Sequence, residues 1–448
     1  MTSRNKNLKK RTDPLMKELS FHLNIIARHV YDTRRGKIIL ATYKQSRYPS
    51  FYVRDAMAVA RFLKALIERG LFVEKAYEIL RGIAKFTRSV QSKEGRWGQK
   101  YNEYGKERSL YKQEDNTAHG IILLGDYLIA RKHLGRRLQK KKYVEAMLKG
   151  FEFARENIYD ESTGLFRSTT SCHESSLETG YTLWTNMAYY KALKNLVQVG
   201  ELYRAKTACR PVQDFMNSFS ENLRQFIRNK RYVARIHFNG KIDFRADVTL
   251  ASPYYFEYDT KSRALVNAVR YAEKKLWDPE LGLYQRYLPN VRDLARHSHA
   301  GSGPWMQYSA IIAQYYLANG RMIKANKILR EIDRYKSSKG YIPEHITTPQ
   351  RFTDFMRDEW KSGLDFQKEF DPSIMVDNYD FDCVVEELIN MRNAYQKTRK
   401  NLRKEARRGF INFALPLSWS HAEYGYAILM KEELRRKRAT RPLGKSVK

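Results

Sequence analysis

Apolar residues recur at the spacing of an α-helix along almost the whole chain. In DAMAVARFLKALIERG (55–70) they form one stripe that includes Met57, Phe62 and Leu66, and the segment ends on a glycine suited to a left-handed cap. The next segment, 72–91, repeats the pattern. Further segments of this kind are 13–31, 117–133, 140–157, 182–199, 203–228, 262–276, 305–319, 322–335, 380–405 and 418–435. No regular alternation of strand and helix accompanies them, so we expect an all-α chain and not a parallel sheet.

The connections between these helices alternate in character. Some are short, such as ERGLF (68–72) and LANGRM (317–322). The long ones mix aromatic, charged and glycine residues: RYPSFYVRD, EGRWGQKYNEYGKERSLYKQEDN, STTSCHESSLETGYT, ELGLYQRYLPN and KGYIPEHITTPQ. Loops of this composition are costly to order, which favours a common use for them. Two rings of helices joined in this way would place every long loop at one end, as in an (α/α)6 barrel with a site at its open mouth.

The net charge and the cysteine content limit which partners and which cellular compartment can be expected for the protein. Lysine and arginine total 83 against 49 aspartate and glutamate, so the formal charge is +34 and an anionic partner is one hypothesis. The basic runs lack the interleaved aromatic residues that are typical of nucleic-acid-binding modules. The alternative to an anionic partner is that these runs are solvent-exposed helix faces. Cys172, Cys209 and Cys383 are too few for a disulfide framework. No apolar stretch is long enough for a membrane span or a signal peptide, and a cytoplasmic location is expected.

A series of segments resembles one known family. They are YPSFYVRDAMAVARFLKALIERG, EGRWGQKYNEYGK, QEDNTAHGIILLGDYL, RADVTLASPYYF, GLYQRYL, GPWMQYSAIIAQYYLANG, GYIPEHI and LPLSWSHAEYGYAIL. In this order they resemble the motifs of the glucoamylase and glucodextranase family, inverting α-glycosidases with an (α/α)6 barrel whose relatives include bacterial trehalases. The resemblance runs from about residue 35 to 435. It implies an all-α (α/α)6 barrel that hydrolyses α-linked oligosaccharides or glycoconjugates and releases glucose or a similar hexose.

The resemblance also implies which side chains hold the sugar. Arg54 and Asp55, with Tyr52 before them, match the family's aromatic-x-Arg-Asp stretch, whose charged pair binds the hydroxyls of the cleaved sugar. An acid at a helix N-terminus beside a surface arginine is the alternative for this pair. The other expected substrate-binding residues are Trp97, Tyr101, Gln113, Asp115, Arg286, Trp305, Trp419 and His421.

Aromatic rings commonly form the floor under the apolar face of a sugar, which is the role expected of Trp97 and Tyr101. Core packing is the alternative for both residues. The stretch EGRWGQKYNEYGK has no helical stripe for a core to use, however, and this favours binding.

Inverting hydrolysis needs a protonated carboxyl to protonate the leaving oxygen and a carboxylate to activate water. Glu344 in YIPEHI follows a proline that cannot continue a helix, and the resemblance implies that it is the general base. Glu423 in WSHAEYGY competes with it, but it lies with His421 on the first turn of an apolar helix, where both more plausibly order the site. No spacing of histidine and carboxylate near His421 completes a metal-ligand set, and neither a metal nor a cofactor is expected.

The general acid is ambiguous in SCHESSLETGY (171–181). The family pattern has Trp-Glu, a glycine four residues after that glutamate, and then a threonine on the following helix. Alignment on Gly180 and Thr185 places Ser176 at the acid, and serine cannot protonate a leaving group. A loop two residues shorter would bring Glu178 to the site, and a bulge would admit Glu174. We rank Glu178 first because it directly precedes the helix start; an acidic first helical turn without a catalytic role is the alternative for both.

The sequence divides into a basic N-terminal tail (1–12), a barrel (13–437) with an insertion at about 351–410, and a basic C-terminal tail (438–448). Few members of the family carry as many residues between Glu344 and Trp419, and the insertion is expected to cover the mouth and narrow the range of substrates. The rival hypotheses are a catalytically silent relative that binds a carbohydrate or another partner, and a basic barrel that acts on or binds an anionic glycoconjugate or nucleic acid.

Overall fold

The computed structural model describes residues 13–44, 46–136, 141–288 and 303–439, in which helices build a closed double ring. The inner ring consists of α2 (Val53–Glu68), α4 (Asp115–His133), α6 (Leu183–Leu202), α8 (Ser252–Tyr255), α10 (Met306–Ala318) and α16 (Ser418–Ala439). Each inner helix packs against the next, and α16 returns to α2. The ring closure is that of an (α/α)6 barrel.

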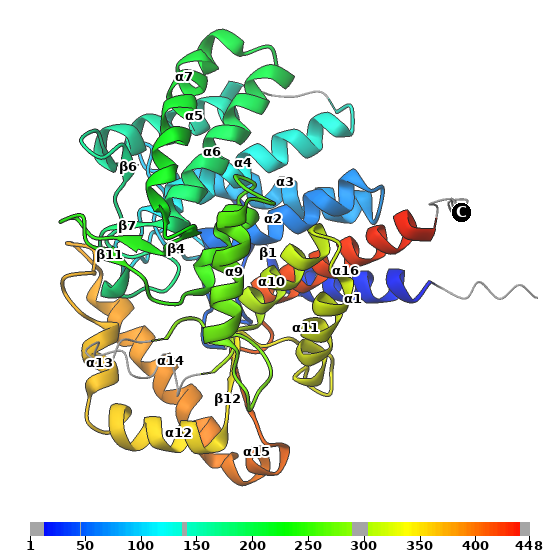
Figure 1. The fold of residues 1–448 in the computed structure, drawn as a ribbon, viewed down its shortest axis with the longest axis vertical. Helices are drawn as coiled ribbons and strands as arrows, with labels where there is room; N and C mark the ends of the chain where they lie inside the picture. The colour runs from blue at the N-terminus through cyan, green and yellow to red at the C-terminus, as the bar shows by residue number, and fades with distance from the viewer. Residues whose placement is uncertain (1–12, 45, 137–140, 289–302, 440–448) are drawn as a thin grey trace, which may run out of the picture.

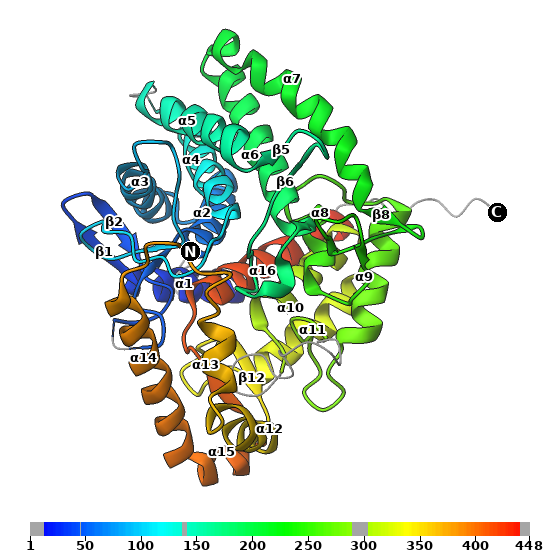
Figure 2. The ribbon, with the colours of Figure 1, turned by 90° about the vertical axis from the view of Figure 1, so that its left-hand side faces the viewer.

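The outer ring covers this inner one. It consists of α3 (Val73–Ser89), α5 (Lys141–Asn157), α7 (Lys206–Asn222), α9 (Arg263–Leu276), α11 (Met322–Arg334) and α1 (Pro14–Arg28). α3, α5, α7, α11 and α1 pack on α2, α4, α6, α10 and α16, whereas α9 packs on the 3₁₀ turn η3 (Val248–Ala251) that leads into α8. Figure 2 shows α3, α5, α7 and α9 outside α2, α4, α6 and α8.

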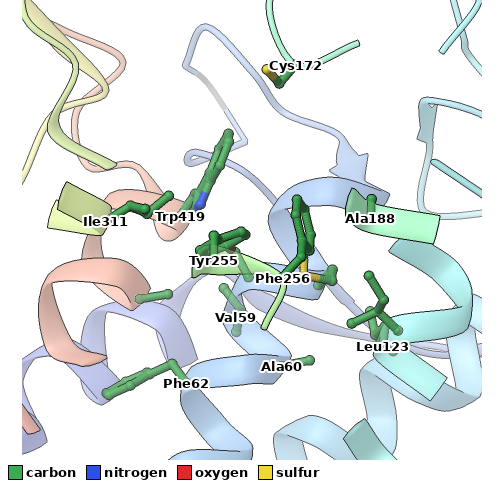
Figure 3. Close-up of a cluster of buried hydrophobic side chains, with 14 of the residues drawn as sticks. Val59, Ala60, Phe62, Leu123, Cys172, Ala188, Tyr255, Phe256, Ile311 and Trp419 are labelled. Carbon is green, nitrogen blue, oxygen red and sulfur yellow. The ribbon is translucent and has the colours of Figure 1, made fainter. Parts of the chain in front are cut away.

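Residue patterns explain which helix lies in which ring. In α10 every residue from 306 to 317 is buried, because this inner helix has neighbours on all sides. In α11 the buried residues are Ala325, Ile328, Leu329 and Ile332, the i, i+3, i+4, i+7 stripe of a helix with one face in solvent. Figure 3 shows part of the core between the inner helices, with Val59 and Ala60 of α2 facing Tyr255 and Phe256.

Most of the expected helices agree with those observed. The helices Pro349–Phe355 and Leu364–Glu369 were not expected, and the expected segment 380–405 is two helices, Phe381–Lys400 and Leu402–Arg408. The inner helix between the expected segments 203–228 and 262–276 is the single turn α8, which is too short to leave a periodic pattern. The segment 203–228 ends as a helix at Asn222 and continues as the 3₁₀ turn η2 (Leu223–Phe226). No described helix is both long and apolar enough to span a bilayer. The predicted N-terminal tail (1–12) and residues 440–448 of the predicted C-terminal tail (438–448) lie outside the described residues, and residues 438 and 439 belong to α16.

Short antiparallel strand pairs tie the long loops together. The strands are β1 (Val30–Thr33), β2 (Gly36–Ile39), β3 (Phe51–Tyr52), β4 (Lys100–Tyr101), β5 (Tyr159–Asp160), β6 (Leu165–Phe166), β7 (Tyr181–Thr182), β8 (Ile227–Arg228), β9 (Arg231–Tyr232), β10 (Arg235–Ile236), β11 (Ile242–Asp243), β12 (His345–Thr347) and β13 (Ile411–Phe413). β1 pairs with β2, β3 with β4, β5 with β6, β8 with β9 and β12 with β13, while β10 lies between β7 and β11. The β3–β4 and β12–β13 pairs hold the loops that carry Tyr52 and Glu344.

The segment between Glu344 and Trp419 forms a small helical unit beside the barrel. It contains α12 (Pro349–Phe355), the π-helical turn η4 (Met356–Trp360), α13 (Leu364–Glu369), α14 (Phe381–Lys400) and α15 (Leu402–Arg408), drawn in yellow and orange in Figure 1. Its apolar side chains form a separate core, which takes in Leu110 and Tyr111 of the 94–116 loop. Glu387 of α14 makes ion pairs with Arg47 and with Lys100, the latter at 3.3 Å. The unit is therefore anchored to two of the long loops.

Candidate active site

A cavity opens where several of the long loops meet, at the N-terminal ends of the inner helices α2, α10 and α16. Its wall consists of Tyr48, Tyr52, Arg54, Asp55, Cys172, Glu174, Arg286, Trp305, Tyr308, Glu344 and Trp419. Three carboxyl groups and two guanidinium groups thus share one aromatic-lined space. Helix N-termini carry partial positive charge, which suits a site rich in carboxylates.

Arg54 is fixed from three sides. Its Nη1 donates to the carbonyl oxygen of Ser171 at 3.3 Å, and its Nη2 donates to Oε1 of Glu174 at 3.1 Å. Its guanidinium lies 5.4 Å from the ring centre of Trp419. Figure 3 shows Trp419 projecting from α16 toward the end of the barrel at which Cys172 lies. The buried Nε has no hydrogen-bond partner among the described residues, so Arg54 keeps a donor in reserve.

Asp55 follows Arg54 in the first turn of α2 and is 8% exposed. Burial raises the pKa of its carboxyl, Arg54 opposes this rise, and the charges of Glu344 and Glu174 add to it, so that the pKa changes from 3.8 to about 7. Asp55 therefore keeps a proton close to neutral pH.

Glu344 lies in the loop between α11 and β12, which the backbone holds firmly. Its N–H donates to the carbonyl of Phe413 at 3.0 Å, and its carbonyl accepts from the N–H of Met306 at 2.9 Å. The side chain is 13% exposed, and its buried Oε2 accepts no hydrogen bond from the described residues. A carboxylate oxygen with a free lone pair at a cavity wall can accept a proton from water.

His421 lies behind this loop instead of at the cavity, where we expected it. Its Nε2 accepts a hydrogen bond from the N–H of Ile342 at 3.0 Å, and its Nδ1 lies 2.8 Å from Nδ1 of His22. Burial, followed by the nearby His22, lowers the pKa of His421 well below its ordinary value, so the ring is neutral. His421 therefore anchors the loop that carries Glu344.

The two glutamates of SCHESSLETGY point to different places. Glu178, which we ranked first as the acid, is 4% exposed and does not line the cavity. Its Oε2 accepts hydrogen bonds from the backbone N–H groups of Ser171 at 2.7 Å and His173 at 3.0 Å. The carboxylate is thus occupied in closing its own loop, which is the physical reason that it does not reach the cavity.

Glu174 lines the cavity. Its backbone has a φ of +55°, in the left-handed region that non-glycine residues seldom adopt. Its Oε1 accepts from Arg54, from Nε2 of Gln99 at 3.1 Å and from Nε2 of Gln113 at 3.2 Å. Strain of this kind is common at functional sites.

Gln113 and Asp115 form a supporting layer and do not line the cavity. Gln113 Nε2 donates to the carbonyl of Ser171 at 2.9 Å as well as to Glu174, and Oδ2 of Asp115 accepts from the hydroxyl of Ser171 at 3.1 Å. Burial raises the pKa of Asp115 to about 7, although Arg54 opposes the rise. Both side chains hold the loop of Glu174 in place, so the contacts to sugar predicted for them are replaced by contacts to protein.

Trp97 and Tyr101 belong to the core. Trp97 Nε1 donates to the carbonyl of Thr87 at 2.7 Å, and its ring fills the space beside two glycines: a Cβ at Gly120 or Gly150 would lie 2.5 or 2.7 Å from it. The hydroxyl of Tyr101 accepts from the N–H of Gly98 at 2.6 Å. Neither residue lines the cavity. The loop sequence alone could not predict their place in the core, because the helices that pack around Trp97 lie elsewhere in the chain.

The aromatic wall comes from other residues. Arg286 stacks at 4.3 Å on the ring of Trp305, and Tyr52, predicted from the same motif as Arg54, also lines the cavity. Sequence reasoning missed Tyr48, Cys172 and Tyr308. Tyr308 comes three residues after Trp305 in α10, a spacing that places both on one helix face and could have revealed it.

No model of a protein family matches this sequence, and no curated protein matches it. Solved structures do match. A glycosidase superposes with a TM-score of 0.60 at 15% identity, over 94% of this chain and 97% of that one. A bacterial glucoamylase complexed with acarbose gives 0.61 at 14% identity, over 95% of this chain and 58% of that one. The glucoamylase of Saccharomycopsis fibuligera gives 0.61 at 13% identity, over 97% and 99%. The chain shares the glucoamylase-like (α/α)6 barrel, which confirms the fold predicted from the sequence.

Proposed function

We propose that this glucoamylase-like barrel is an inverting glycoside hydrolase that releases glucose, or a similar hexose, from α-linked glucosides. The observation that carries the proposal is the cavity itself, in which Glu174 and Glu344 come from different loops and meet beside Asp55, Arg54 and Arg286. Two glutamates on one aromatic-lined cavity are what general acid and base catalysis of glycoside hydrolysis requires.

Glu344 is proposed as the general base. It would draw a proton from a water molecule that attacks the anomeric carbon, and its unpartnered Oε2 is available to that water. In an inverting enzyme the two carboxyl groups lie roughly 6.5–9.5 Å apart, which leaves room for the water between base and sugar.

Glu174 is proposed as the general acid in place of Glu178. Three N–H donors hold its Oε1, which leaves Oε2 to carry a proton to the leaving oxygen. The raised pKa of Asp55, about 7, supports the presence of a proton among the carboxyl groups near neutral pH.

Arg54, Asp55 and Arg286 are proposed to bind the sugar that is cleaved. Charged hydrogen bonds to hydroxyls are strong and directional, and the Nε atoms of both arginines are buried without hydrogen-bond partners among the described residues. Trp419 and Trp305, each stacked on an arginine, provide apolar faces for the ring. The solved relatives complexed with glucose and with acarbose support a hexose of this class.

The experiment is glucose release from maltose, isomaltose and trehalose by purified protein. We expect turnover on at least one of them, and we expect Glu344→Gln to abolish it. Glu386→Gln is the matched control. Glu386 is a half-exposed residue of α14 that does not line the cavity, and its carboxylate forms an ion pair with Arg108 at a distance of 2.8 Å. Absence of turnover on a broad panel of α-glycosides would favour the catalytically silent rival.

A further inference from the structure

Three side chains with metal-binding atoms converge beside the cavity, in the loop that carries Glu174. Sγ of Cys172 lies 3.8 Å from Nδ1 of His173 and 3.7 Å from Oε1 of Glu178. The three ligand atoms all lie within 4.8 Å of one another, and all three residues are buried. None of these atoms has a part in the proposed hydrolysis.

The two separations from Sγ of Cys172 fit a tetrahedral metal. Zinc binds cysteine sulfur at about 2.3 Å and histidine nitrogen at about 2.0–2.1 Å, and at a tetrahedral angle these bonds place the two ligand atoms about 3.6 Å apart. The separations around Sγ of Cys172 are within a few tenths of an ångström of that value. A thiolate, an imidazole and a carboxylate are also a ligand set that zinc accepts.

A second carboxylate orients the histidine. Nε2 of His173 lies 2.8 Å from Oδ1 of Asp247, which also accepts from the N–H and the hydroxyl of Thr249 at 2.9 and 2.8 Å. Because Oδ1 of Asp247 is the acceptor in these contacts, Nε2 of His173 is the nitrogen that donates to it, and the lone pair of Nδ1 is left toward Cys172. Carboxylate–histidine–metal chains of this kind are typical of zinc sites.

We propose that Cys172, His173 and Glu178 bind one zinc-like divalent cation, with Asp247 orienting His173 and a fourth position left for water. On binding, the ion takes the thiol sulfur as thiolate and the proton passes to solvent, with no change of redox state. Cys172 lines the cavity, which provides a route for the ion. The site is independent of the proposed hydrolysis, although it would brace the residues on both sides of Glu174.

A hydrogen-bonded thiol without a metal is the competing account of the same distances. Burial, followed by the charges of Glu178 and Asp247, raises the pKa of the Cys172 thiol well above its ordinary value, so without an ion the sulfur keeps its proton and donates to Glu178. The two accounts differ in whether a metal ion displaces that proton.

The test is a titration of the reduced, metal-free full chain with Co²⁺, followed by absorption spectroscopy. We expect one Co²⁺ per chain, with a sulfur-to-metal charge-transfer band and the intense visible bands of tetrahedral cobalt, and we expect Zn²⁺ to displace it. Cys172→Ser should weaken binding by at least about 100-fold and remove the charge-transfer band. Cys209→Ser and Cys383→Ser are the matched controls, since both cysteines are also buried and should leave the band unchanged.

Asp247→Asn retains all three ligands, and it decides the question even if Cys172→Ser does not fold. We expect a loss of about 10–100-fold in affinity for Co²⁺, as is typical when an outer partner of a metal-bound histidine is removed. The proposal is overturned if the wild-type chain shows no charge-transfer band, if the band persists in Cys172→Ser, or if Asp247→Asn binds Co²⁺ with unchanged affinity.

Discussion

Replacement of Asp55 by asparagine should make the protein more stable at alkaline pH while it abolishes activity. Asp55 is buried, and its pKa in the folded chain is about 7 against an ordinary value of 3.8. Between these pH values the unfolded chain has released its proton and the folded chain still holds it. The stability that the protonated group confers is complete below about pH 3.8 and is lost as the pH rises through 7.

The size of this effect follows from the two pKa values. Each unit of difference is worth about 1.4 kcal/mol, so the full loss is about 4 kcal/mol, of which about 3 kcal/mol falls between pH 5 and pH 9. Asparagine does not titrate, so the free energy of unfolding of the variant does not fall in this way as the pH rises. Asp115 and Glu114, whose pKa values burial also raises to about 7, are common to both proteins and cancel in the comparison.

The assay is urea denaturation of wild type and Asp55→Asn at pH 5 and pH 9. We expect the free energy of unfolding of the variant, relative to wild type, to be about 3 kcal/mol higher at pH 9 than at pH 5. Using the difference between two pH values removes the constant effect of the amide itself. An equal difference at both pH values would refute the reasoning, because it would mean that Asp55 does not titrate in this range.

Three further predictions test individual residues. Glu174→Gln should slow hydrolysis of glucosides with alcohol leaving groups by about 10²–10⁴-fold and affect aryl glucosides with good leaving groups far less, because only poor leaving groups need the acid; equal losses on both would contradict this role. His421→Ala removes the acceptor for the N–H of Ile342 and should lower the free energy of unfolding by about 1–3 kcal/mol, together with a reduced kcat from a loosened Glu344 loop; an unchanged kcat would argue against the anchoring role. Trp97→Phe should cost about 1–3 kcal/mol in chemical denaturation with KM unchanged, and a raised KM would instead favour the sugar contact first expected of it.

The fold was predictable because helices in a double ring leave different marks on the sequence. Outer helices such as α11 show a single stripe, and inner helices such as α10 are apolar on all sides, so both could be recognised without a structure. The turn α8 could not, since four residues carry no period. The separate core of α12 to α15 depends on contacts with Leu110 and Tyr111, which lie far away in the chain.

The sequence predicted part of the cavity wall. Arg54, Asp55 and Trp419 lie at the starts of inner helices, whereas Glu344 and Arg286 come from loops, and all five line the cavity. Gln113, Asp115 and His421 lie behind the cavity wall. The motifs identified these residues but could not show whether they contact a ligand or other protein residues. Glu174 was ranked below Glu178 because a left-handed φ at a glutamate is a property of the folded loop that spacing does not reveal.

The central claim is that Glu344 and Glu174 hydrolyse an α-glucoside with inversion, and the anomer of the first-formed glucose tests it most directly. Proton NMR recorded during the first turnovers on the preferred α-linked substrate distinguishes the two anomers before they equilibrate. We predict β-glucose as the initial product, because water activated by Glu344 attacks from the face opposite the leaving group. Initial formation of α-glucose would contradict the claim, since it would require a carboxylate to attack the sugar in place of water.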